Sequence, residues 1–507
     1  MKGEMSISQR RGVISLLPKE DANLLKLANW RPITLLNVDY KIVSKVIATR
    51  FEKVLDFLIS PDQTGFLKGR YVGQNIRLVN DVVEQTKIQN IPGILVQLDF
   101  CKAFDTIEWS FIKRSLALFN FGDSIQQWVS TFYNYSESAV LNNGFCTNFF
   151  KLSRGVRQGC PLSPYLFIVG AEILACKIRQ DKTIKGITVF QKELKLSQFA
   201  DDTTLLCNDC NSVNRAITVL NSFGNLSGLK LNPSKTKALW LGSLRNRKDE
   251  PFNFKWPKEP LRVLGTYISY DEEQNEEFNF KGKMQKLDTI LGIWNSRNLT
   301  LFGKYLITKS LGISQLVHPL STLDFPSQLV QAVNSSILKF IWKNRRDKIK
   351  RKIMVQDYIE GGLRAPSIET MAKSLKLAWI SRFSQSIPAH DDESWKVIPN
   401  HFFDKYGGLN FLLRCNYDKN FLDKMSLSYF YKLILLHFLE LKISYNTQFC
   451  RFVLFNNCKD ILIGGRPFFY RSWMNKNVFL VQDLLGDDGK VLSYSEFYRE
   501  FQLNGNF

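Results

Sequence analysis

The chain has 507 residues, of which 45% are hydrophobic and 23% are charged, a balance that indicates a globular protein and excludes a disordered one. Its length is sufficient for roughly two to four domains with their own cores. Lys and Arg number 68 against 47 Asp and Glu, and this net charge of +21 suits an extended polyanion such as nucleic acid, or an anionic membrane surface.

The nine cysteines are scattered, and no apolar run approaches the ~18 residues of a membrane span. An odd number of cysteines in a large chain whose start does not resemble a signal peptide indicates reduced thiols in an intracellular protein. Cys207 and Cys210 form a lone C-x-x-C pair. No second pair with zinc spacing follows and the histidines lie far away, so a zinc site is disfavoured there.

The first 92 residues predict a strand in GVISLLPKED (12–21) and a helix from about 42 to 58, which a Ser-Pro pair ends. The glycine-containing loop QTGFLKGRYVGQN (63–75) leads into a second amphipathic helix. Four cations in this region lie close to turns or strand ends: Lys19, Arg31, Lys68 and Arg70. Such cations are candidate donors to a triphosphate, and solvated surface charges are the alternative.

A buried strand is predicted at 94–98, with Asp99 at its carboxyl end. Asp105 and Glu108 have the spacing of a capping box, which predicts that Asp105 caps a helix and has a structural role. Asp99 is then the carboxylate left to face a cleft, because open α/β sheets bind ligands at this edge. An ordinary Asp at a loop entry is the alternative.

The segment SRGVRQGCPLSPYLF (153–167) combines a polar glycine-rich loop with the start of an apolar, buried helix expected from about 162 to 178. Gly155 and Gly159 permit a sharp bend or close approach to a ligand. The two prolines of the segment suit the start of a helix. The loop is therefore a candidate template or nucleotide contact, or else an ordinary helix entry.

The stretch LKLSQFADDTTLLCN (194–208) predicts a β-hairpin with Asp201 and Asp202 at its tip. Alternate side chains of a strand point to opposite faces, whereas a tight turn can bring both carboxylates to one side. Two carboxylates this close repel each other unless a cation lies between them. The tip is interpreted either as a metal-binding site or as an exposed acidic turn.

The order strand, helix, helix, hairpin, helix, strand over residues 90–270 predicts an α+β sheet of the ferredoxin-like class with helices on one face. GLKLNPSKTKALWLG (228–242) predicts two further strands around an Asn-Pro turn and carries Lys235. A strand pair is expected at 261–269. The charge-rich stretch 271–277 is a linker candidate.

Helical patterns from about 281 to 343 predict a small helical domain that ends in KNRRDKIKRK (343–352), with seven cations in ten residues. This run is a solvated face, a surface that tracks phosphates, or a nuclear-import signal. Residues 353–507 are rich in helical pattern and aromatic residues, and no chemistry is assigned to them.

Asp99, Asp201 and Asp202 belong to the first strand and the hairpin, which are neighbours at the centre of a ferredoxin-like sheet, so the three are expected to converge. Three carboxylates without His or Cys suit hard cations such as Mg²⁺. Two such ions can stabilise the attacking 3′ oxygen and the leaving pyrophosphate oxygen in nucleotidyl transfer.

Taken in order, these motifs resemble the reverse transcriptases of non-LTR (LINE-type) retrotransposons along nearly the whole chain. The segments that carry the resemblance are NWRPITLLNVDYKI (29–42), QTGFLKGR, LDFCKAFDTIEW (98–109), SRGVRQGCPLSPYLF, FADD (199–202), GLKLNPSKTK, VLGTYIS (263–269), KFIWKNRRDKIKR (339–351) and GGLRAPSIE (361–369). The resemblance implies a right-hand polymerase with fingers at 1–92, a ferredoxin-like palm at 93–270 with interleaved fingers elements, a helical thumb at 271–343 and a helix-rich, basic C-terminal region at 344–507.

The resemblance also implies a catalytic metal site. Asp99, Asp201 and Asp202 are expected to be the catalytic carboxylates. They would bind two Mg²⁺ ions, or Mn²⁺ in their place, with the help of the Phe100 carbonyl.

A nucleotide site is implied beside these carboxylates. Phe104 is expected to be the steric gate that excludes a ribose 2′-OH, because an aromatic ring beneath C2′ leaves no room for that hydroxyl. Gln158 is expected to contact the incoming nucleotide. Arg31, assisted by Lys19, would hold the triphosphate, and Lys235 would donate a proton to the leaving pyrophosphate.

The expected activity is RNA-directed DNA polymerisation from dNTPs on an RNA template, primed at a target-DNA 3′ end, by a ribonucleoprotein of the nucleus or cytoplasm without a membrane partner. The family's upstream endonuclease domain and Cys/His knuckle are missing from this sequence, and the fingers begin abruptly. A truncated, catalytically silent RNA- or DNA-binding remnant is therefore the alternative. An RNA-templated RNA polymerase would share the palm, but Phe104 argues against it.

Overall fold

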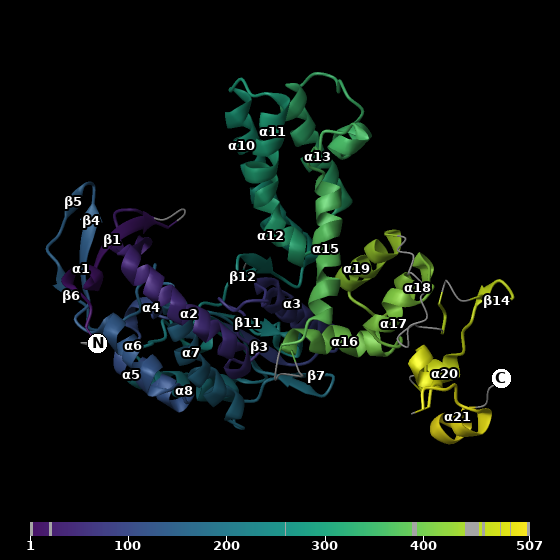
Figure 1. Ribbon diagram of the computed structural model, residues 1–507, viewed down its shortest axis with the longest axis horizontal. Coiled ribbons are helices and arrows are strands. Elements are labelled where there is room, and N and C mark those ends of the chain that lie inside the picture. Colours follow the sequence, from purple (N-terminus) through teal and green to yellow (C-terminus); the bar gives the residue numbers. More distant parts are fainter. Residues whose placement is uncertain are drawn as a thin grey trace. The chain divides into compact units, whose positions relative to one another are not determined.

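The structure is a computed structural model that describes residues 4–19, 23–258, 260–387, 393–441, 456–458, 462–476, 478–486 and 488–503. It divides into two compact units (Figure 1). The first comprises Met1–Asn275 and Ser386–Trp395, and the second comprises Glu276–Gln385 and Lys396–Phe507. The first unit thus includes a short segment that lies far downstream in the chain.

The first unit combines several sheets with helices. Its strands are β1 (Arg11–Pro18), β2 (Trp30–Leu36), β3 (Gly93–Leu98), β4 (Glu137–Asn142), β5 (Phe145–Cys146), β6 (Phe150–Lys151), β7 (Ile187–Val189), β8 (Lys192–Leu194), β9 (Leu196–Phe199), β10 (Asp202–Cys207), β11 (Lys237–Leu241), β12 (Leu261–Val263) and β13 (Thr266–Ile268). Its helices are α1 (Ile7–Arg10), α2 (Val38–Leu58), α3 (Val72–Ile88), α4 (Ala103–Thr106), α5 (Trp109–Leu118), α6 (Asp123–Tyr133), α7 (Ser163–Gln180) and α8 (Cys210–Ser227).

The central sheet has the antiparallel order β11-β3-β10-β9. Its two middle strands are β3 and β10, paired with Leu98 opposite Thr203. The predicted neighbourhood of first strand and hairpin is therefore confirmed, and the fold is α+β as expected. The prediction of helices on one face of this sheet is incomplete. Helix α3 also contacts β9 and β11, and β3 is buried on both faces.

One core fills the space between the central sheet and helices α5, α7 and α8. Ile94, Val96 and Leu98 of β3 contribute to it from alternate positions of the strand. Most residues of α7 are buried, as its apolar sequence predicts. Burying a side chain such as Leu or Phe stabilises the folded state by roughly 1.5–3 kcal/mol. This core therefore holds the ends of the central strands in place.

A second sheet has the order β2-β1-β4-β5, with β6 paired to β4. Strands β1 and β2 are antiparallel, and Leu17 lies opposite Arg31. The Lys19 amide donates to the Asn29 carbonyl at 2.9 Å just beyond the paired region. This pairing brings the predicted triphosphate ligands Lys19 and Arg31 to one end of the sheet.

One strand prediction is wrong. In the segment 228–242 only β11 forms, and Leu231 makes an isolated bridge with Phe100, the second residue after β3. The linker candidate 271–277 contains the boundary between the two units, which falls after Asn275. It is largely helical, since α9 (Glu272–Glu276) continues through a π-helical turn, Glu277–Lys281, into the next helix.

The second unit is mostly helical. Its helices are α10 (Gly282–Asn295), α11 (Leu301–Ile307), α12 (Ser314–Thr322), α13 (Ser327–Trp342), α14 (Arg351–Val355), α15 (Ile368–Ser384), α16 (Val397–Asp404), α17 (Leu409–Arg414), α18 (Lys419–Lys424), α19 (Tyr429–Glu440), α20 (Arg471–Asn475) and α21 (Tyr494–Phe501). A strand pair, β14 (Leu462–Ile463) and β15 (Arg466–Pro467), accompanies them.

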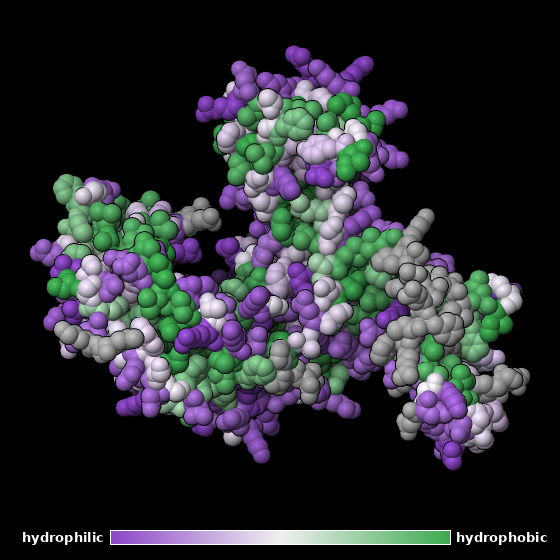
Figure 2. All heavy atoms as spheres, viewed as in Figure 1, coloured by the Kyte–Doolittle hydropathy of each residue, from purple (hydrophilic) through white to green (hydrophobic). Residues whose placement is uncertain are grey.

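The main core of this unit joins α10, α12 and α13 and includes Met354, Ala365 and Ile368, so it continues beyond residue 343. The basic run 343–352 follows α13 and is exposed except for Ile349, which is half-buried. Figure 2 shows hydrophilic side chains around the edge of the region where α11 and α13 lie. In the part of the chain that the structure describes, each helix is too short or too polar to cross a bilayer.

Candidate active site

The three predicted catalytic carboxylates line one cleft of about 920 Å³ in the first unit. Asp99 directly follows β3, Asp201 lies in the turn of the β9–β10 hairpin, and Asp202 begins β10. Every other predicted site residue also lines this cleft: Lys19, Arg31, Phe100, Phe104, Gln158 and Lys235. The structure therefore brings together residues from both sheets and from at least five separate stretches of sequence.

The hairpin turn is formed by Ala200 and Asp201, between the paired residues Phe199 and Asp202. Ala200 has a φ of +56°, the left-handed conformation that tight hairpin turns require. The side-chain amide of Gln63 holds this residue from both sides: it accepts from the Ala200 amide at 2.7 Å and donates to the Ala200 carbonyl at 3.2 Å. Gln63 is thus a positioning residue for the acidic turn, which sequence analysis missed.

Gln63 and its neighbour Gly65 belong to the predicted glycine-containing loop. A Cβ on Gly65 would lie 2.4 Å from the Ala200 amide nitrogen, so only glycine permits the loop to lie this close to the turn. Gln63 itself is 1% exposed. The polar, glycine-containing pattern of QTGFLKGR was the available signal, and it could not indicate a partner more than a hundred residues away.

Asp99 is held by the segment that precedes β11. Its amide donates to the Thr236 hydroxyl at 3.3 Å, and its carbonyl accepts from the Asn232 amide at 2.8 Å. The next residues continue this pairing, since the Cys101 amide donates to the Lys230 carbonyl at 2.9 Å. The same pairing brings Lys235 to the cleft wall.

Phe104 lies on the cleft wall in α4. Its ring stacks on Phe167 of α7 with centroids 4.4 Å apart and planes 13° apart, and it meets Phe66 edge-on at 6.2 Å. Its carbonyl accepts from the Val156 amide at 2.7 Å. Stacking and backbone pairing together leave the ring little freedom to move.

The predicted capping role of Asp105 is wrong. Asp105 lies inside α4, whose N-cap is Lys102, and Glu108 is the N-cap of α5. The helix breaks at Ile107 because the Gly155 amide donates to the Ile107 carbonyl at 2.8 Å. Asp105 instead accepts from the Gln158 side-chain amide at 3.3 Å, and burial raises its pKa, an effect that this hydrogen bond partly offsets.

The backbone on either side of Gln158 is fixed by β2. The Gln158 carbonyl accepts from the Thr34 amide at 2.7 Å. Gly159 has a φ of +119°, and a Cβ there would lie 2.4 Å from the Thr34 carbonyl oxygen. Gly159 was predicted to permit close approach to a ligand, and in the structure it permits close approach to β2. Arg157, which sequence analysis also missed, lines the cleft and lies over the Tyr40 ring at 5.4 Å.

The four predicted cations separate into two groups. Lys19 and Arg31 line the cleft, whereas Lys68 is exposed elsewhere and the side chain of Arg70 is buried. The Arg70 guanidinium donates to the carbonyls of Ser60, Gln63 and Ile59 at 2.5, 2.8 and 2.8 Å. A triphosphate role for Arg70 is therefore wrong, because its donors already hold the loop.

Arg70→Met and Arg31→Met are expected to act on different properties. Arg70→Met should lower the free energy of unfolding by about 3 kcal/mol, because three carbonyls and Asp56 lose a buried partner. The family resemblance implies that Arg31 holds a triphosphate, so Arg31→Met, at a residue that lines the cleft, should leave stability nearly unchanged and raise the KM for dNTPs. Urea unfolding and steady-state incorporation kinetics of both variants measure this separation, and a raised KM in Arg70→Met at unchanged stability would contradict it.

The acidic turn is electrostatically unfavourable by itself. Burial raises the pKa of Asp202 to about 6, and the charges of Asp201 and Asp99 add to this rise. Burial also raises the pKa of Asp201, where its own backbone amide acts in the opposite sense and the charge of Asp99 adds to the rise. Asp202 keeps exposed surface, but that surface opens into the cleft, whose walls displace part of the water.

This raised pKa predicts a pH-dependent stability. An Asp in the unfolded chain titrates near 3.8, so between about pH 4 and pH 6 the folded protein holds more protons, and its stability falls as the pH rises. The loss should be on the order of 1 kcal/mol, because water in the cleft screens the charges. Urea unfolding of metal-free wild type and Asp202→Asn measures it. The stability difference should grow in favour of the variant across this range, and a constant difference would contradict the prediction.

The carboxylates fit a hard divalent cation by their chemistry. They share one cleft, in which the charge of Asp99 raises the pKa of both turn carboxylates and the charge of Asp201 raises that of Asp202. A bound divalent cation would neutralise this concentration of negative charge. In the described ranges, no three His, Cys, Asp or Glu side chains already form a compact metal-binding group.

Comparison with known proteins identifies relatives of this chain. The family described as "Reverse transcriptase (RNA-dependent DNA polymerase)" matches residues 17–268. The transposon TX1 uncharacterized 149 kDa protein of Xenopus laevis is 30% identical over 409 residues, which cover 79% of this chain and 31% of the relative. A Pol polyprotein from a type-1 retrotransposable element R2 of Popillia japonica is 28% identical over 226 residues, 44% of this chain and 31% of the relative.

This chain therefore spans about a third of the length of these two relatives. Among solved structures, telomerase from Candida Tropicalis in complex with a TWJ fragment of telomeric RNA is 15% identical with a TM-score of 0.41. That similarity covers 78% of this chain and 65% of the telomerase chain.

Proposed function

Since this chain belongs to the reverse transcriptase family, and within it to the proteins of non-LTR retrotransposons, we propose that it is an RNA-directed DNA polymerase that copies element RNA into DNA. The observation that carries this proposal is the convergence of three carboxylates, an aromatic ring and cations on one cleft. Its substrates are dNTPs, an RNA template and a DNA primer, and priming occurs at a target-DNA 3′ end.

The metal-binding part of the site consists of Asp99, Asp201 and Asp202, with the Phe100 carbonyl as an additional oxygen ligand. Two Mg²⁺ ions, or Mn²⁺, would supply charge stabilisation at the attacking and leaving oxygens. The reaction forms a bond between the primer 3′ oxygen and the α-phosphorus and breaks the bond to pyrophosphate. The raised pKa values of the turn support this assignment, since a cation favours the charged carboxylates.

The remaining cleft residues act on the nucleotide. Arg31 and Lys19 bind the triphosphate, whose charge is spread over several oxygens. Gln158, oriented by Asp105, contacts the incoming nucleotide. Phe104 excludes a 2′-OH, and Lys235 donates a proton to the pyrophosphate oxygen as it leaves.

The other regions follow from the same proposal. Residues 1–92 form the fingers, 93–270 the palm, 271–343 the thumb and 344–507 a C-terminal nucleic-acid-binding region. The exposed basic run 343–352 supports binding to phosphates, which salt should weaken. The protein works as part of a ribonucleoprotein in the nucleus or cytoplasm, and an endonuclease domain belongs to the complete element.

Primer extension by the purified full chain tests this function. An RNA template with a DNA primer, dNTPs and Mg²⁺ should give extended DNA, and EDTA should stop the reaction. Salt-sensitive RNA binding without any extension would overturn the proposal in favour of a silent binder. Equal use of rNTPs and dNTPs would instead indicate an RNA polymerase with the same palm.

A further inference from the structure

The acidic turn is held by residues 59–65, here called the clamp loop. The side-chain amide of Gln63 in this loop makes two hydrogen bonds to the backbone of Ala200, one as acceptor and one as donor. The loop also pairs with β9, because the Gln198 amide donates to the Asp62 carbonyl at 2.8 Å and the Thr64 amide donates to the Gln198 carbonyl at 2.9 Å. The position of the turn therefore depends on the position of the clamp loop.

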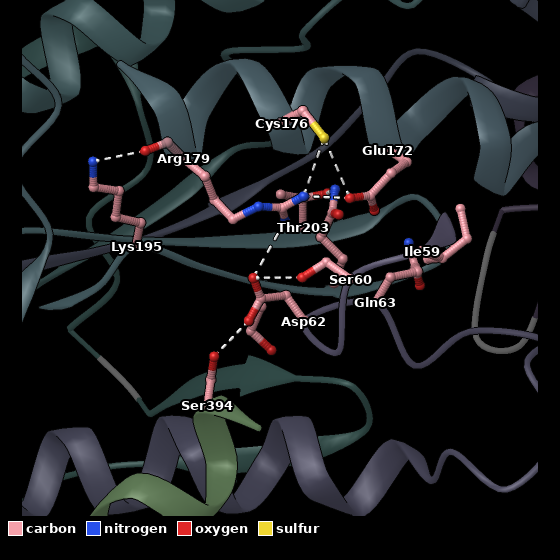
Figure 3. Close-up of polar contacts among 12 residues, drawn as sticks. Ile59, Ser60, Asp62, Gln63, Glu172, Cys176, Arg179, Lys195, Thr203 and Ser394 are labelled. Carbon is pink, nitrogen blue, oxygen red and sulfur yellow. Dashed lines mark hydrogen bonds and ion pairs between the residues drawn. The ribbon is translucent and has the colours of Figure 1, made fainter. Parts of the chain in front are cut away.

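The clamp loop itself has two polar anchors. Arg70 holds its backbone through three carbonyls. The second anchor is the carboxylate of Asp62, which accepts from the Ser60 hydroxyl at 3.3 Å and from Arg179 of α7 at 3.3 Å (Figure 3). Arg179 also pairs with buried Glu172 of the same helix, so the Asp62 anchor is tied to the central core.

A segment that lies far downstream in the sequence contacts the Asp62 anchor and acts on the Arg70 anchor through its charge. The Ser394 hydroxyl donates to the Asp62 carboxylate at 2.6 Å, and Figure 3 shows it approaching from the side opposite Arg179. Glu393 is 6% exposed, and its negative charge acts on the Arg70 guanidinium. Buried Trp395 donates its indole N–H to Glu393 at 2.8 Å, which fixes the segment locally.

We propose that Ser394 is a positioning residue of the polymerase site, and that Glu393, Ser394 and Trp395 complete the catalytic unit by fixing the clamp loop against the acidic turn. This inference rests on the proposed function for its catalytic consequence. The region 17–268 that matches the reverse transcriptase family is then incomplete by itself. A segment that follows α15 supplies its missing support.

A short series of hydrogen bonds and adjacent residues connects Ser394 to the acidic turn. Ser394 fixes the side chain of Asp62, the adjacent residue Gln63 holds Ala200, and Asp201 and Asp202 follow directly. A hydrogen bond to an ionised carboxylate is stronger than one between neutral groups. Loss of the bond from Ser394 to Asp62 should therefore loosen the clamp loop. A small displacement of reacting groups lowers the rate steeply, whereas substrate binding in the cleft depends on other residues.

The test compares Ser394→Ala with two matched variants in the full chain. Ser394→Thr keeps the hydroxyl, and Ser386→Ala removes an exposed hydroxyl from the same segment. Hydrogen exchange of metal-free protein is followed in the turn, residues 196–203, and in β3. Single-nucleotide incorporation on an RNA template then gives kcat and KM for dNTP.

We expect Ser394→Ala to speed exchange in the turn severalfold without changing β3, and to lower kcat by about tenfold with KM unchanged. Ser394→Thr and Ser386→Ala should resemble the wild type. Unchanged exchange in the turn, or equally faster exchange in β3, would overturn the proposal, the latter by showing a general loss of stability. An inactive wild type with the expected exchange pattern would refute the polymerase function and leave the positioning role standing.

Discussion

Asp202→Asn is expected to lower primer extension by about 10³-fold while making the metal-free protein more stable at neutral pH. The substitution keeps the size of the side chain and removes its charge. The catalytic loss follows because a neutral amide is a poor ligand for a divalent cation. The gain in stability follows because the charges of Asp201 and Asp99, which raise the pKa of Asp202, no longer face a third negative charge.

These opposite signs make the experiment decisive. A variant that is inactive because it is misfolded would lose stability, whereas loss of the metal site alone leaves the fold intact or strengthened. Asp249→Asn is the control, because Asp249 is an exposed carboxylate of the same unit that pairs with Arg247 at 2.5 Å. Extension should be measured beside urea unfolding and the binding of a primer–template duplex. Undiminished extension by Asp202→Asn would remove this residue from the catalytic group.

The parts of the site that could be predicted from sequence are those encoded by local patterns. Two β-forming runs around Ala200 and Asp201 predict a hairpin, and the buried run before Asp99 predicts a strand. Because β3 and β10 are adjacent in the sheet, the carboxylates at their ends reach one cleft. The roles of the individual residues came from the family resemblance and stay proposals until they are tested by substitution.

The parts that escaped prediction depend on partners that are distant in sequence. Asp105 has the spacing of a capping residue, but backbone pairing between 155–156 and the carbonyls of Phe104 and Ile107 ends the helix before that cap can form. Arg70 resembles a phosphate ligand until the carbonyls of residues 59–63 occupy its donors. Ser394 carries no pattern, and its importance arises only from its position beside Asp62.

Phe104→Val should raise the ratio of ribonucleotide to deoxyribonucleotide incorporation by roughly 10²-fold, about the discrimination that a steric pocket achieves against an added hydroxyl. The ring is held flat against Phe167 at 4.4 Å, so it cannot move aside for a 2′-OH without losing this contact. Valine removes the ring and leaves the backbone pairing of Val156 with residue 104 in place. Deoxyribonucleotide incorporation should fall only severalfold.

Phe104→Tyr is the matched comparison because it keeps the ring and its stacking on Phe167. It should retain discrimination close to that of the wild type, and incorporation rates for each nucleotide class on the same RNA template measure all three proteins. If Phe104→Val still rejected ribonucleotides, the gate would have to lie elsewhere on the cleft wall. If the wild type already accepted both nucleotide classes equally, the ring would not act as a gate. That result would indicate an RNA polymerase with the same palm in place of a DNA polymerase.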